Sequence, residues 1–263
     1  MNKRSRFGFF LFCLLGTIPV FVKSQPDIPF NQDLKSNCQS WKIKMKQNGI
    51  WGEKPAMVSF GQLKTISTES GKPIESVKEV DRELFWKNIR TEKSREGVME
   101  LDLGDRDTAI IRILAVNVEK TREKNTLGTL ANVNGEGEES YQDSSWVDEM
   151  IIRFYNDSTG WYYHKLVTDT AFGVLENIAD TSVRFFLHKV NYLEGKKMKD
   201  VMFSQPAVGF VFVFAGKQIT AVQTLLKQMI WVSNALDPAQ KKIVLATAAA
   251  IIATVKSGNS NGY

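Results

Sequence analysis

Residue types suited to metal binding or nucleophilic catalysis are scarce in this sequence. It holds two histidines, His164 and His188, and two cysteines, of which only Cys38 lies beyond the N-terminal segment described below. That set is too small for the usual structural zinc sites or for a three-histidine catalytic site. No Gly-x-Ser-x-Gly segment marks a serine nucleophile, and no glycine-rich phosphate loop is present. The sequence therefore predicts no catalytic residue, no metal ion and no cofactor.

Carboxylates gather in two segments, 102–107 and 136–139. Calcium binds clustered oxygens, but the spacing of the three aspartates in 102–107 does not match an EF-hand loop. We favour a solvated turn for the first segment and a solubilising loop for the second. The alternative function is a hydrolase acting on envelope or host glycans, with carboxylates in 102–107 or at Asp148-Glu149. Nothing in the sequence selects a catalytic pair.

Aromatic side chains are dense between residues 146 and 163. Flat exposed rings bind sugars and peptides by stacking, and sheet cores use the same residue types. The sequence leaves both alternatives open. The candidate ligand face consists of Trp146, Phe154, Tyr155, Trp161 and Tyr163.

Alternation of apolar and polar residues is the main structural signal. Residues 108–118 are also dense in β-branched side chains, which predicts a central strand. The polar, glycine-bearing residues 119–144 predict a mobile loop. Short strands without helices between them predict a mainly antiparallel β-sandwich. The predicted strands are 41–46, 56–66, 98–103, 108–118, 146–155, 161–167, 181–190 and 207–214, of which 146–155 and 161–167 are expected to pair as a hairpin.

The C-terminal part changes to helical periodicity. Apolar residues recur at three- and four-residue steps between Ile219 and Ile230, which predicts one helix. The residues Asp237-Pro238 and Gln240 predict the start of a second helix, over about 239–256. Its uncharged stretch, 243–255, is too short to span a bilayer. We expect that stretch in the core or in a protein interface, with membrane insertion as a third alternative.

The N-terminal residues have the three parts of a secretory signal peptide. Lys3, Arg4 and Arg6 precede an apolar run over 7–22, and we expect cleavage after Ser24. Removing four of the 34 basic residues leaves 30 against 29 acidic ones, which argues against a nucleic-acid partner. The run is too short for a stable span, so we expect a secreted or periplasmic protein. The predicted organisation is a signal peptide at 1–24, a β-sandwich domain at 25–216, a helical pair at 217–256 and a disordered tail at 257–263.

One stretch resembles a known group of proteins. The segments Trp146–Glu149, Arg153–Tyr155, Trp161-Tyr162 and Val183–Leu187 are similar to secreted β-sandwich proteins of Verrucomicrobia associated with type IV pilus-like gene clusters. The similar stretch runs from residue 146 to 188, about 45 of the 263 residues. The resemblance implies an immunoglobulin-like sandwich with an adhesion or pilus-associated role, and no catalytic residues.

Composition and organisation together favour a non-enzymatic protein. We expect an exported binding or structural protein that meets a protein partner, or a second copy of itself. The contact is expected through the polar loop at 119–144 or through the C-terminal helical pair, of which the helical pair is the better candidate.

Overall fold

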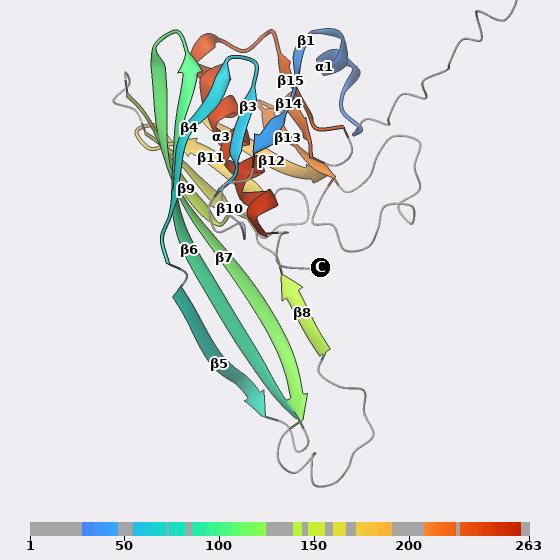
Figure 1. The fold of residues 1–263 in the computed structure, drawn as a ribbon. Helices are drawn as coiled ribbons and strands as arrows, with labels where there is room; N and C mark the ends of the chain where they lie inside the picture. Colours follow the sequence, from blue (N-terminus) through green and yellow to red (C-terminus); the bar gives the residue numbers. More distant parts are fainter. Residues whose placement is uncertain are drawn as a thin grey trace, which may run out of the picture.

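The computed structural model describes residues 28–46, 55–72, 74–82, 86–124, 139–143, 147–155, 160–166, 172–190, 208–224 and 227–258. This part of the chain is mostly antiparallel β-structure with one C-terminal helix, which confirms the predicted mainly-β class (Figure 1). The predicted signal peptide and residues 259–263 of the predicted tail lie outside the described residues. The helices are α1 (Gln32–Ser36) and α3 (Pro238–Gly258). The strands are β1 (Cys38–Lys42), β2 (Lys44–Lys46), β3 (Met57–Phe60), β4 (Leu63–Ser70), β5 (Ile74–Arg82), β6 (Trp86–Gly104), β7 (Asp107–Lys124), β8 (Glu139–Asp143), β9 (Glu149–Phe154), β10 (Gly160–Lys165), β11 (Gly173–Asn177), β12 (Arg184–Val190), β13 (Gly209–Phe214), β14 (Lys217–Gln223) and β15 (Met229–Ser233).

These strands form one sheet of 15 strands that nearly closes on itself. Its path begins with β1, which pairs with β15, and ends with β2, which pairs with β3. Only Ile43 separates β1 from β2, and its amide donates to the carbonyl of Gln228 at 2.9 Å. One short segment therefore joins both ends of the sheet. The finer prediction, a sandwich of two sheets, is not confirmed by this strand order.

Side chains alternate between the inside and the outside of the closed part of the sheet, as the strand period requires. In β7, Ala109 and Ile111 are fully buried, whereas Ile110 between them is 47% exposed. The hairpin of β9 and β10 follows the predicted pairing, with Met150 opposite Tyr163 and Ile152 opposite Trp161. The apolar residues that alternate in the sequence of these strands are thus the ones that face the interior of the sheet.

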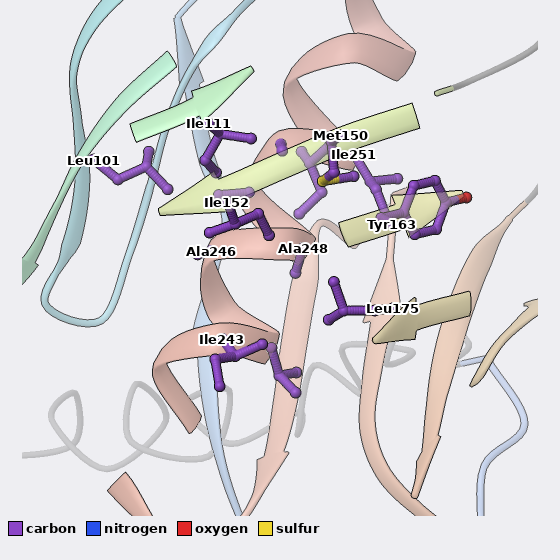
Figure 2. Close-up of a cluster of buried hydrophobic side chains, with 14 of the residues drawn as sticks. Leu101, Ile111, Met150, Ile152, Tyr163, Leu175, Ile243, Ala246, Ala248 and Ile251 are labelled. Carbon is purple, nitrogen blue, oxygen red and sulfur yellow. The ribbon is translucent and has the colours of Figure 1, made fainter. Parts of the chain in front are cut away.

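Helix α3 fills the interior of the sheet. Its buried side chains belong to the same core cluster as the inward side chains of the surrounding strands (Figure 2). Because the successive residues Ala249, Ala250 and Ile251 are all fully buried and point about 100° apart around the axis, the helix is covered on every side there. It begins with the predicted capping interaction, in which the amide of Gln240 donates to Asp237 Oδ1 at 2.8 Å. The helix is core, and the expectation that it forms an interface is not supported.

Residues 28–36, which include α1 and which we call the N-terminal segment of the described chain, cover the outside of β13, β14 and β15. Ile28, Phe30 and Leu34 pack there against Val211 and Trp231 in a second buried cluster, with the rings of Phe30 and Trp231 5.0 Å apart. Two glutamine side chains of β14 hold this segment by accepting its backbone amides. These strands are therefore buried on both faces.

Four strands extend beyond the closed part of the sheet and form a projecting arm (Figure 1). We define the arm as β5, residues 86–95 of β6, residues 115–124 of β7, and β8. It starts where β6 loses its partner β4, after the pair Ser70 and Gly97, and where β7 loses its partner β9, after the pair Leu114 and Glu149. Among the described strands, β5 pairs only with β6 and β8 only with β7, so the arm has two edges.

The predicted first helix of the C-terminal pair is wrong. Residues 217–223 and 229–233 are strands β14 and β15, and β14 follows β13 through a tight turn at Ala215-Gly216, both with positive φ. A strand that is buried on both faces loses its period of two. Its apolar residues then match helical spacing by coincidence. The predicted second helix is confirmed as α3.

The predicted loop at 119–144 is also partly wrong. Residues 119–124 continue β7 and residues 139–143 form β8, while 125–138 and 144–146 lie outside the described residues. Residues 119–124 pair with β6, and 118–122 pair with β8. These residues therefore have regular structure although their sequence is polar.

Candidate binding groove at the base of the arm

The structure does not gather the candidate aromatic face on the surface. Phe154, Trp161 and Tyr163 point into the core and are at most 7% exposed. Tyr155 is 83% exposed, and Trp146 lies outside the described residues. The described members of the set thus fill the core, with the single exception of Tyr155. The ring of Trp161 is tilted against that of Phe185, with centroids 5.6 Å apart, within the same core cluster.

The aspartates of segment 102–107 stabilise a turn and a helix. The carboxylate of Asp102 accepts the amide of Gly104 at 2.9 Å, within a turn whose Gly104, Asp105 and Arg106 have positive φ. Asp107 is buried and forms an ion pair with Lys242 of α3. Among the described residues, no group of three or more His, Cys, Asp or Glu side chains is placed to hold a metal ion.

Asp148 and Glu149 are neighbours in the sequence, but their carboxylates have different surroundings. Asp148 Oδ2 accepts the amide of Val116 at 2.6 Å, and its other oxygen lies 3.8 Å from Lys165 Nζ. Glu149 is exposed and lines a groove on the outer surface. These two carboxylates therefore do not face each other across a common site.

This groove lies where the arm joins the closed sheet and encloses about 550 Å³. Three carboxylates line it, from Glu69, Glu96 and Glu149, together with the guanidinium of Arg112. Val98, at 37% exposure, contributes apolar surface. The remaining lining residues are Ser70, Gly71, Gly97, Ile113, Leu114, Met150 and Ile151.

Strand register orders the groove into two rows of outward side chains. One row runs Glu96, Leu114, Glu149, with each residue opposite the next. The parallel row runs Val98, Arg112, Ile151. Acidic positions thus flank an apolar residue in the first row, and apolar positions flank a cation in the second.

Two side chains of β10 continue these rows beside the groove. Tyr162 lies opposite Ile151, and His164 lies opposite Glu149. Burial raises the pKa of Tyr162, and the nearby carboxylates of Glu149 and Glu176 raise it further. The phenol thus lies beside the Glu149 carboxylate. The two rings of Tyr162 and His164 lie 5.5 Å apart.

Both histidines lie within strands, as predicted, and both are half-buried. His164 carries a buried Nδ1 that has no hydrogen-bond partner. His188 lies on β12, opposite Val211 of β13, away from the groove. The structure therefore brings one histidine, one tyrosine and one carboxylate together, but it leaves the second histidine elsewhere.

Sequence reasoning identified Glu149 only as half of a different pair, and missed the other charged lining residues. Glu96 and Arg112 lie on β6 and β7, which form a hairpin, whereas Glu69 lies on β4, which is separated from β6 in the sequence by β5. The outward alternation of β6 and β7 was the one signal available for them.

Comparison of the chain with protein-family models, with curated proteins and with solved structures gave no match. Within the described part of the chain, no helix combines the length and the apolar character needed to cross a membrane.

Proposed function

We propose that this protein is an exported, non-enzymatic binding or structural protein that contacts a protein partner through the arm and the groove at its base. The arm is the observation that carries the proposal. Its edge strand β5 exposes Ile74 to 69% and Val77 to 64%, and the register places these residues on opposite faces. Exposed apolar side chains on both faces of a projecting sheet are typical of a surface that another chain covers.

The division of roles within the fold supports this proposal. The closed part of the sheet is filled by α3, and the core residues of β6 and β7, such as Met99 and Ile111, lie in the closed part and not in the arm. Export rests on the N-terminal sequence pattern alone, and an adhesion or pilus-associated role with an immunoglobulin-like sandwich rests on the resemblance alone. These finer statements stay proposals.

Site-specific photo-crosslinking tests the proposed function. A benzoylphenylalanine replaces Val77 in the full chain, expressed in the cells that normally make it, and mass spectrometry identifies any adduct. The same probe at Tyr155, which is 83% exposed on the closed part, is the matched control. We expect one dominant adduct from position 77 and none from position 155. Equal adducts from both positions, or none from position 77, would contradict an arm-mediated contact.

One observation favours the hydrolase as a second candidate. Glu96 and Glu149 line the same groove and flank Leu114 in one row, so their Cα atoms are about 10 Å apart, two strand spacings. Inverting glycosidases hold their two carboxyl groups roughly 6.5–9.5 Å apart, and flexible side chains on strands at this Cα spacing can reach that separation. Incubation of the mature chain with fluorescent envelope glycans tests this, and the hydrolase requires a turnover that Glu96→Gln and Glu149→Gln each abolish.

A further inference from the structure

We propose that the groove binds an extended peptide segment that carries a lysine or arginine next to an apolar residue. This inference rests on the proposed function, because it assigns a chemical class to the partner that the arm would contact. It is carried by the lining of the groove: three carboxylates, one guanidinium and apolar side chains within about 550 Å³. That volume lies within the roughly 300–1,000 Å³ of typical ligand sites.

The carboxylates define the charge of the segment. Glu69, Glu96 and Glu149 outnumber the single cation Arg112 around the groove. A cationic side chain that enters between Glu96 and Glu149 meets two carboxylates, one on either side of Leu114. Tyr162 and His164 of the neighbouring strand β10 lie beside Glu149 on the same outer face.

Arg112 and the apolar positions define the rest of the segment. The guanidinium of Arg112 has only donors, and an extended peptide presents carbonyl oxygens that accept from it. Val98 and Ile151 lie directly opposite Arg112 on either side and offer contact to an apolar neighbour of the basic residue. A peptide thus matches all three kinds of lining group.

Other ligand classes fit the lining less well. Sugar sites use flat aromatic rings, and among the described residues the rings of Tyr162 and His164 lie beside the groove but not in its lining. Phosphate groups and nucleic acids would meet three carboxylates for one cation. The described residues also provide no cluster of three metal ligands.

Fluorescence polarisation tests the inference on the whole mature chain. The probe is a fluorescein-labelled Val-Arg-Val-Lys-Val peptide, and Val-Glu-Val-Glu-Val is its matched acidic control. We expect saturable binding of the basic peptide only, and weaker binding as salt rises from about 50 to 300 mM, because salt screens exposed charges. Glu96→Gln and Glu149→Gln are each expected to weaken binding about two- to fivefold.

The control variant is Glu100→Gln, which removes a carboxylate of β6 in the closed sheet, outside the groove lining, and keeps an oxygen that accepts from the Ser67 hydroxyl. We expect it to bind as the unmodified chain does. The inference is overturned if both peptides bind alike, if neither binds, or if Glu100→Gln weakens binding as much as the groove variants. Saturable binding of N-acetylglucosamine oligomers that Glu149→Gln removes would overturn it in favour of the hydrolase.

The outcome separates this inference from the proposed function. Adducts at Val77 without peptide binding would support the arm as a contact surface and contradict the basic peptide as the ligand of the groove. Peptide binding without adducts would support the groove as a peptide site and contradict contact through the arm. Circular dichroism of every variant confirms that a loss of binding does not come from a loss of fold.

Discussion

The carboxylate of Asp148 accepts the backbone amide of Val116 at 2.6 Å, immediately beyond the last pair of the β7–β9 ladder. The amide of Asp148 itself donates to the carbonyl of Leu114 at 3.0 Å. One residue thus continues the ladder by its backbone and then by its side chain. This contact lies where β7 leaves the closed sheet and enters the arm.

Replacing Asp148 with alanine should loosen the base of the arm. The half-buried amide of Val116 would lose its acceptor, which costs about 1–3 kcal/mol. We expect a fall of this size in the free energy of unfolding and faster hydrogen exchange at Val116. Asp148→Asn keeps an oxygen that can accept and should lose less. Unchanged exchange at Val116 in Asp148→Ala would show that the contact does not hold the arm.

Most of the closed sheet was predictable, because its strands have one buried and one exposed face. The hairpin of β9 and β10 shows this, since its alternating residues pair as expected. β14 and β15 were not predictable in the same way. The N-terminal segment buries their outer residues Ala221 and Trp231, so the alternation disappears.

The arm and the groove were harder to predict for different reasons. Residues 119–124 of the arm read as a polar loop although they continue β7, because a polar run without alternation gives no strand signal. The groove joins Glu69 of β4 to Glu149 of β9 across two intervening strands. The spacing of residues along the sequence therefore gives no sign that Glu69 and Glu149 line the same groove.

The hydroxyl of Tyr163 offers a simple stability test. It is fully buried and has no hydrogen-bond partner in the structure. An unsatisfied buried hydroxyl is unfavourable, so Tyr163→Phe should raise the free energy of unfolding by about 1 kcal/mol. Urea unfolding of both proteins measures the difference. A loss of more than about 1 kcal/mol would mean that the hydroxyl makes a favourable bond after all.

The same side chain predicts a dependence on alkaline pH. Burial, with a smaller effect of Asp148, raises the pKa of Tyr163 well above its ordinary value of 10.0. Above pH 10 the unfolded chain releases this proton while the folded chain keeps it, so stability falls as pH rises. We expect the free energy of unfolding to decline from about pH 10 upward. Tyr163→Phe should decline less steeply, and equal slopes would contradict this assignment.

A chain that ends at Gly216 should not fold. It would lack β14, which pairs with β13, and β15, which pairs with β1 and so closes the sheet. It would also lack α3, whose buried Val244, Ala248 and Ile251 fill the interior. Chromatography with light scattering should show an aggregated or expanded species, beside a compact chain of residues 25–263.

Near-ultraviolet circular dichroism gives the second readout of that truncation, because fixed aromatic packing produces the signal. The rings of Phe185, Phe210 and Phe212 remain in the shortened chain but lose the helix that encloses the core. We therefore expect their signal to disappear. A compact monomer with a retained signal would show that the sheet folds without α3. That outcome would favour the alternative in which the helix forms a protein interface.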